Sequence, residues 1–264
     1  MPYTTAATSR TPALIVYLID ISGSMNDPMD GRPKIEHVQD ALRTVLQKMV
    51  QRSTKGEIVS PRYRIAMLTY NDEVANGLPA GCGEVATITD VVRLGRPTFR
   101  PGNGTNTALG FERVRDLLAR EMPNQADRPA PLVCHLTDGQ FMGADPSPVV
   151  RQIQAMANND GNVLVENIYI GRDLVKKPIL NVETWPGLRS KSEVTDSYAE
   201  TLFEMSSMLP ESYCLNIENE GFGLKPGSRM LLPCDNRDLI ELAFAASGAT
   251  PTTPFAAYGA AATR

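Results

Sequence analysis

The sequence predicts an α/β protein with a doubly wound, mostly parallel central sheet and helices on both faces. Short apolar runs alternate with amphipathic helical patterns from residue 13 to residue 170, and this alternation is typical of parallel strands joined by crossover helices. The run at residues 13–19 ends in Asp20, and a later run at residues 132–137 ends in Asp138. The 264 residues are enough for one large domain with a substantial core.

The first part of the chain predicts three strands and one long helix. Residues 13–19 are continuously apolar, which indicates a strand buried on both faces. In residues 35–50, apolar side chains recur at helical spacing and charged ones fill the opposite face, which predicts an amphipathic helix. Residues 63–70 predict a second strand, and residues 74–78 predict a short strand at the edge of the sheet.

The middle of the chain begins with an irregular stretch. Residues 81–104 are rich in glycine, proline and threonine, and they predict loops with one short helical turn near Asp90. The remaining elements of the regular alternation are a helix at residues 107–121, a strand at 132–137, a helix at 148–157 and a strand at 163–170.

The alternation is interrupted after Gly171 and returns near the end of the chain. Between these points one helical pattern is evident, around residues 198–209, and we expect a proline to close it. Residues 212–229 look irregular, residues 228–232 predict the last strand, and residues 236–246 predict the last helix.

These patterns predict one domain with an insertion. The expected parts are a flexible arm over residues 1–11, a domain over residues 12–248 with an insertion before the last strand at residues 172–227, and a disordered tail over residues 249–264. A separate small module at residues 172–227 is the alternative.

Composition and charge exclude several functions. The net charge is −4 and no basic run is present, so nothing favours a nucleic-acid partner. No apolar run approaches the ~20 residues that span a bilayer, and the N-terminus lacks the pattern of a secretory signal. We therefore expect a cytoplasmic protein without a membrane partner. The four cysteines form no C-x-x-C pair and are expected to be reduced, with a Cys214–Cys234 bridge as the alternative.

Three loops carry carboxylate or hydroxyl side chains, whose oxygen atoms can bind a metal ion. Asp20, Ser22 and Ser24 place a carboxylate and two hydroxyls at alternate positions after the first apolar run. Thr105 ends a glycine-broken loop before a helical pattern, and Asp138 follows another apolar run. Because the carboxyl ends of parallel strands meet at one edge of a sheet, we expect these loops to lie together. Hard oxygen donors suit Mg²⁺ first and Mn²⁺ second.

Each of these residues alone has a plainer explanation. Ser22 could cap a turn, Thr105 could be the N-cap of a helix, and Asp138 could satisfy backbone amides. It is the complete set, in this order, that favours a metal site.

The set resembles the metal-ion-dependent adhesion site of the von Willebrand factor type A domain family. The matching residues, in the family's order, are Asp20, Ser22, Ser24, Thr105 and Asp138. Residues 65–74 are similar to the family's second strand and its turn into the third, and the resemblance covers about residues 14–171. It implies an antiparallel strand at residues 74–78 and a metal ion held directly by the three hydroxyls, with the two carboxylates acting directly or through water.

The resemblance also implies a function. Neutral ligands leave the metal electrophilic, so that it can capture an Asp or Glu side chain of a partner protein. We therefore expect a metal-dependent protein-interaction module. The chain resembles stand-alone intracellular bacterial members of the family, which often work beside AAA+ ATPases or in stress and tellurium-resistance signalling with kinases and phosphatases. The expected contact rim comprises Met25, Asn26, Asn103, Asn106, Gln140, Phe141 and Met142.

A Mg²⁺-dependent hydrolase or phosphatase that uses Asp20 and Asp138 is the alternative. Aspartyl-nucleophile phosphatases carry a second acid two residues after the nucleophile, where this chain has Ser22. A serine nucleophile needs a G-x-S-x-G turn and a histidine partner, and no such pattern surrounds Ser24. No lysine, histidine or further acid stands in a motif position to act as a base, so we expect no catalytic residue.

Overall fold

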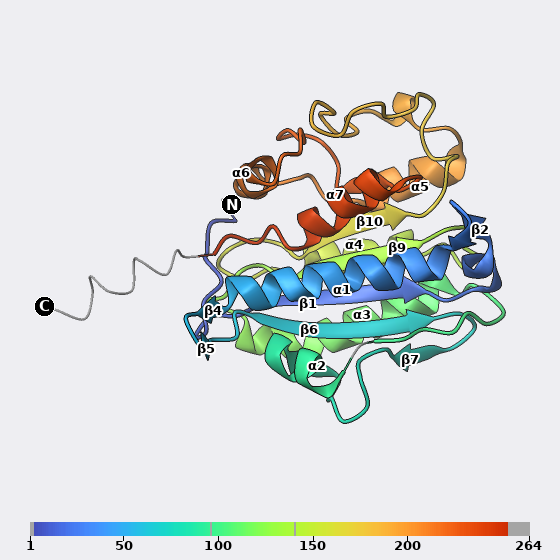
Figure 1. The fold of residues 1–264 in the computed structure, drawn as a ribbon. Coiled ribbons are helices and arrows are strands. Elements are labelled where there is room, and N and C mark those ends of the chain that lie inside the picture. Colours follow the sequence, from blue (N-terminus) through green and yellow to red (C-terminus); the bar gives the residue numbers. More distant parts are fainter. Residues whose placement is uncertain (1–2, 96, 140, 253–264) are drawn as a thin grey trace, which may run out of the picture.

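A single central sheet with helices on both faces organises the molecule (Figure 1). The structure is a computed structural model that describes residues 3–95, 97–139 and 141–252. The strands of the sheet are β1 (Ala13–Asp20), β6 (Tyr63–Tyr70), β7 (Val74–Asn76), β8 (Val85–Thr87), β9 (Leu132–Thr137), β10 (Leu164–Tyr169) and β11 (Leu231–Pro233). Their order is β11-β10-β9-β1-β6-β7, with β8 also paired to β6. Neighbours from β11 to β6 run parallel, and β7 and β8 run antiparallel to β6. The predicted fold class is confirmed.

Two helical layers bury the two faces of this sheet. The helices are α1 (Lys34–Arg52), α2 (Ile88–Leu94), α3 (Thr107–Glu121), α4 (Ser147–Ala155), α5 (Ser197–Met205), α6 (Glu211–Asn219) and α7 (Arg237–Ser247). Apolar side chains of α1, α2, α6 and α7 share one core with Ile15, Tyr17 and Ile19 of β1. Side chains of α3 and α4 share the other core with Leu14, Val16 and Leu18. Alternate residues of β1 thus enter different cores, which explains why its sequence is apolar throughout.

The connection from β10 to β11 contains a crossover helix. Because β10 and β11 are parallel neighbours, the chain must cross one face of the sheet between them. Helix α5 makes this crossing: Met205 joins the core of α3 and α4, and Leu202 packs with Leu231 in a third cluster. The segment that the sequence marked as an insertion therefore includes a helix that the sheet topology itself requires.

Several short elements differ from the sequence prediction. Residues 212–229 were expected to be irregular, yet residues 211–219 form α6, and Pro210 is the N-cap of that helix rather than the end of the preceding one. Small hairpins β2 (Pro28–Met29) with β3 (Arg32–Pro33) and β4 (Thr54–Lys55) with β5 (Ile58–Val59) flank α1. Each strand of these hairpins has only two residues, so the sequence cannot show the alternation of apolar and polar residues that identifies a strand.

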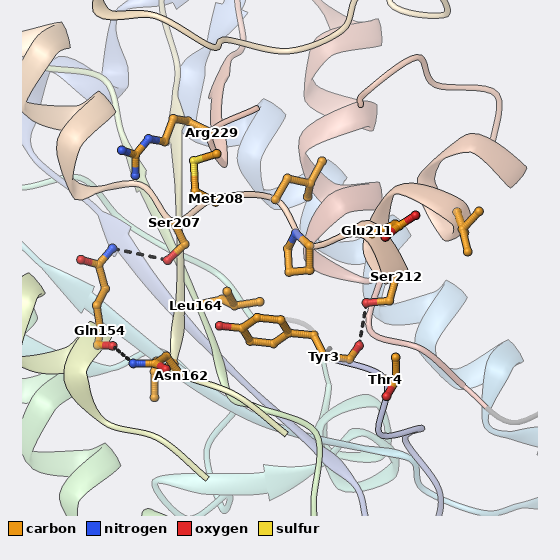
Figure 2. A pocket seen from close by; sticks show the side chains of 14 residues that line it. Tyr3, Thr4, Gln154, Asn162, Leu164, Ser207, Met208, Glu211, Ser212 and Arg229 are labelled. Atoms are coloured by element: carbon orange, nitrogen blue, oxygen red, sulfur yellow. Dashed lines mark hydrogen bonds between the residues drawn. The ribbon is translucent and has the colours of Figure 1, made fainter. Parts of the chain in front are cut away.

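The described part of the N-terminal arm is packed against the domain. Ala7 is fully buried, and its backbone N–H donates to the carbonyl of Pro251 at 2.7 Å. Tyr3 lines a pocket of about 670 Å³ near the amino end of β10, and Ser212 Oγ donates to the Tyr3 carbonyl at 2.6 Å (Figure 2). The arm is therefore held by contacts far away in sequence. The expected disordered tail lies mostly outside the described residues.

Two properties of the described chain bear on its surroundings. None of the helices within residues 3–252 is both long and apolar enough to cross a membrane. All four cysteines are free thiols, so the alternative of a Cys214–Cys234 bridge is not realised.

Candidate metal centre

Asp20 and Asp138 lie at the carboxyl ends of adjacent parallel strands. Asp20 is the last residue of β1, and Asp138 directly follows β9, which pairs with β1. From β1 the chain passes first to β6 on one side and later to β9 on the other, so the strand order reverses at β1. Open α/β sheets bind ligands in the crevice at such a reversal. Both side chains are buried there.

A chain of hydrogen bonds joins the first loop to the second aspartate. Asp20 Oδ1 accepts from the Ser22 backbone N–H at 2.8 Å. The Ser22 and Ser24 hydroxyl oxygens are 3.1 Å apart, and Ser24 Oγ donates to Asp138 Oδ1 at 2.8 Å. Four of the five predicted residues therefore form one continuous cluster of oxygen atoms.

Backbone contacts hold the loop of Thr105 against both of the other loops. The N–H of Gly102 donates to the carbonyl of Ile21 at 2.7 Å, and the N–H of Met142 donates to the carbonyl of Thr105 at 3.0 Å. Thr105 is buried. The N-cap of α3 is Asn106, whose side chain accepts from the Leu109 N–H at 3.1 Å. Because Asn106 does the capping, the plainer explanation of Thr105 as an N-cap does not hold.

Gly104 is required at its position for two reasons. Its φ is +80°, in the left-handed region that favours glycine. A Cβ atom built on it would lie 1.8 Å from Oδ1 of Asp72. An alanine here would therefore both strain the backbone and force the Asp72 side chain away, and the adjacent Thr105 would move with it.

We expect Gly104→Ala to lower the free energy of unfolding by roughly 1–2 kcal/mol, the usual cost of a left-handed L-residue, and also to weaken Mn²⁺ binding. Gly56→Ala is the matched control, because Gly56 has φ +60° with nothing within 4 Å of the added Cβ. Urea unfolding and calorimetric titration would measure the two effects. Equal metal affinity in the two variants would show that the loop of Thr105 does not contribute to the site.

Burial and neighbouring charge make Asp20 a weaker acid than usual. The pKa of Asp20 is raised from 3.8 to about 6: burial is the largest cause, hydrogen bonds from Ser22 and Thr137 oppose it, and the negative charge of Asp138 adds to it. Thr137 Oγ1 donates to Asp20 Oδ2 at 2.9 Å. The carboxylate is thus held in a fixed orientation, mostly ionised at neutral pH, and poorly solvated, so a cation beside it would relieve an electrostatic cost.

A buried polar network supports Asp20 from below. His135 Nδ1 is 2.8 Å from Asn167 Oδ1, and Asn167 donates its amide to Ser206 Oγ at 2.9 Å. Nδ1 therefore carries the proton, and Nε2 accepts from the Tyr70 hydroxyl at 2.8 Å. Burial lowers the pKa of His135 to about 4, so the ring is neutral at pH 7. His135 is a buried core residue. Its ring is hydrogen-bonded to Tyr70, whose oxygen is 3.4 Å from Asp20 Oδ2.

The residues present fit a hard divalent cation. The hydrogen-bonded cluster supplies two carboxylates and two hydroxyls, all oxygen donors, and the loop that carries the buried Thr105 is held against it. Within the residues that the structure describes, no group of three or more His, Cys, Asp or Glu side chains is placed to hold a metal ion. The donor set is thus the one that Mg²⁺ and Mn²⁺ prefer.

Two contacts at the site were not predicted from the sequence. Lys34, the first residue of α1, donates from Nζ to Asp138 Oδ2 at 2.8 Å. Tyr198 of α5 donates its hydroxyl to the carbonyl of Gly139. A lysine in the first turn of a helix is unfavourable and can be noticed in the sequence. Nothing near Tyr198 in the sequence indicates its contact with Gly139.

The predicted contact rim is partly wrong. Met25 is fully buried in the core beneath α1, because the 3₁₀ turn Gly23–Asn26 directs it inward. Asn26 and Asn103 are exposed, and Met142 is 65% exposed. Asn106 and Phe141 are partly exposed. Gln140 lies outside the described residues. Among the described residues, the rim therefore consists of three asparagines and two apolar side chains, Phe141 and Met142.

Comparison with known families agrees with this geometry. The family model for the von Willebrand factor type A domain matches residues 15–140, a range that includes all five candidate ligands. Over these residues the chain matches this family, whose domains generally mediate metal-dependent protein interactions. Comparison with curated proteins gave no match.

Solved structures of one mussel protein show the same fold. Proximal thread matrix protein 1 from the mussel byssus, in a structure described as having a zinc-occupied MIDAS motif, is 18% identical with a TM-score of 0.54. A second crystal form of that protein is 17% identical with a TM-score of 0.53. Both alignments cover 91% of this chain and 48% of the mussel chain, so this chain spans about half the length of that protein. The vWF domain of the pili tip protein Mfa5 from Porphyromonas gingivalis is 19% identical over 52% of this chain and 40% of that one, with a TM-score of 0.34.

Proposed function

We propose that the protein is an interaction module that binds an Asp or Glu side chain of a partner protein through a Mg²⁺ ion, with Mn²⁺ as the substitute. The observation that carries the proposal is the hydrogen-bonded cluster of Asp20, Ser22, Ser24 and Asp138 at the reversal point of the sheet. A divalent cation held there would supply an open position for a carboxylate oxygen.

The surrounding side chains are suited to binding rather than to proton transfer. His135 lies beneath the site with both ring nitrogens in hydrogen bonds. Lys34 is paired with Asp138, and the Tyr198 hydroxyl with a carbonyl oxygen. None of these groups faces the exposed edge as a free base. We therefore propose that the protein is not an enzyme. Mg²⁺-dependent hydrolysis of phosphate esters that disappears in Asp20→Asn would instead support the hydrolase alternative.

We further propose a cytoplasmic role in a regulatory or stress-response complex. Four free thiols suit a reducing compartment. The suggestion of an AAA+ ATPase or a kinase and phosphatase system as partner rests on the resemblance to stand-alone bacterial members, which is an analogy at the level of the fold. Cell fractionation tests the compartment, and recovery of the protein outside the cell would contradict it.

The test of the proposed function is a pull-down from native lysate. We expect a partner to be retained with Mg²⁺ and lost both with EDTA and in Asp138→Asn. Asp116→Asn is the matched control, because Asp116 is an exposed acid on α3 away from the site. A partner retained equally in all conditions would show that binding uses another surface.

A further inference from the structure

Lys34 occupies a position that its own helix does not favour. It is the first residue of α1, after Pro33, which provides no side-chain cap. The positive end of the helix dipole lies there, so a lysine at this position destabilises the helix. The acid of this first turn, Glu36, pairs with Arg32 instead. The stability of α1 therefore does not explain the lysine.

Its contact with Asp138 does explain the position. Lys34 Nζ lies 2.8 Å from Asp138 Oδ2, and the Asp138 side chain has no accessible surface while that of Lys34 is 16% exposed. The other oxygen of Asp138 accepts from Ser24 at 2.8 Å. Both oxygens of this candidate ligand are thus occupied by partners within the chain, and a buried carboxylate without a partner would be costly.

We propose that Lys34 is a resident cation that competes with the divalent metal for Asp138 and makes metal binding depend on an acidic partner. This proposal rests on the metal site proposed above. A metal held by the same carboxylate would lie close to the ammonium group, in a place where little water separates them, so the two cations would repel each other.

The net charge of the site explains why an acidic partner would favour metal binding. Asp20, Asp138 and Lys34 together carry −1 − 1 + 1 = −1 when ionised. A divalent cation brings this sum to +1, and a carboxylate from a partner brings it to 0. Without Lys34 the corresponding sums are −2, 0 and −1. The lysine therefore leaves the metal-loaded site with an excess positive charge that an acidic side chain removes.

Lys34→Met tests the competition, because methionine keeps the length of the stem and removes the charge. Lys48→Met is the matched control: Lys48 lies on the same helix, pairs with Glu220, and is 45% exposed. Calorimetric titration with Mn²⁺ in a carboxylate-free buffer, above the pH range in which Asp20 titrates, measures the affinity. We expect Lys34→Met to bind Mn²⁺ about tenfold more tightly than the natural chain, equivalent to about 1.4 kcal/mol, and Lys48→Met to be unchanged.

Two further measurements separate this proposal from a structural role of Lys34. Metal-free Lys34→Met should melt at a lower temperature, and saturating Mn²⁺ should raise its melting temperature more than that of the natural chain. Acetate, used as a carboxylate probe against chloride at equal ionic strength, should strengthen Mn²⁺ binding more in the natural chain than in Lys34→Met. Lys34→Gln repeats all three measurements if the methionine variant does not fold.

The outcomes distinguish the two proposals. Equal or weaker Mn²⁺ affinity in Lys34→Met, with binding intact in the natural chain, would overturn the competition and leave the metal site in place. Failure of every variant to bind Mn²⁺ would overturn the metal site and this inference together.

Discussion

Asp20→Asn is expected to abolish metal binding while the metal-free protein stays at least as stable at neutral pH. Asparagine has nearly the shape of aspartate, so its oxygen can still accept from the Ser22 N–H and its amide can donate to Thr137 Oγ1. The variant lacks the charge that a cation needs. We expect an affinity loss of roughly 100-fold or more, since even outer partners of metal ligands are typically worth 10–100-fold.

The direction of the stability change follows from the pKa of Asp20. Burial raises that pKa from 3.8 to about 6 in the folded protein. Between these values the unfolded chain binds fewer protons than the folded one, so stability falls as pH rises through about 4 to 6. A shift of about two units corresponds to roughly 2–3 kcal/mol, all of it lost at pH 7. Asparagine does not titrate and avoids this penalty.

Titration calorimetry with Mn²⁺ and urea unfolding of the metal-free protein would measure the two effects. Asp116→Asn removes the same charge from an exposed site and should change neither. Unaltered Mn²⁺ affinity in Asp20→Asn would rule out Asp20 as a ligand. A large loss of stability would show instead that the buried charge itself is structural.

The sequence predicted best the elements whose apolar pattern is long and regular. β6, α3 and β9 have the expected bounds, residues 63–70, 107–121 and 132–137. In each, either a continuous apolar run or a repeated helical spacing leaves little choice of structure. Helix α6 was missed although Tyr213, Cys214 and Ile217 are buried at helical spacing, because the pattern is only two turns long.

The candidate site could be predicted because its residues lie in local motifs at strand ends. Asp20, Ser22 and Ser24 are close in sequence, and the parallel sheet brings Asp138 beside them. Contacts that depend on distant segments could not be predicted in this way. Lys34 reaches Asp138 across 104 residues, and His135 and Tyr70, which support Asp20, are 65 residues apart. Met25 was misplaced because a turn sequence does not show which of its side chains faces inward.

The buried acid Glu166 is the second residue expected to have a large effect. It lies in the interior of β10, opposite Cys134 of β9, and is fully buried. Neither carboxyl oxygen has a hydrogen-bond partner of good geometry, although the nearby Cys134 thiol lowers the pKa of Glu166. Burial dominates and raises the pKa of Glu166 to about 8, so the side chain is mostly protonated at pH 7.

Glu166 should therefore make the protein less stable as the solution becomes more alkaline. Its pKa in the unfolded chain is near 4.5, and in the folded chain about 8. Between these pH values Glu166 is protonated in the folded state and ionised in the unfolded state. The contribution of this proton to the free energy of unfolding is fully present below pH 4.5 and is lost as pH rises through 8. The slope is about 1.4 kcal/mol per pH unit, and the total is on the order of 3–5 kcal/mol.

Glu166→Gln removes this titration and keeps the shape of the side chain. We expect the variant to gain stability relative to the natural chain as pH rises from 5 to 8, by roughly 3 kcal/mol over that range. Urea unfolding at several pH values measures the difference. The change of stability with pH, and not its value at one pH, is the decisive quantity, because the added amide N–H groups shift the stability by a constant amount.

Glu57→Gln, at an exposed position, controls for the loss of one negative charge. A difference that does not change with pH would mean that Glu166 ionises inside the fold as easily as in water, and that the interior between β9, β10 and α7 admits solvent.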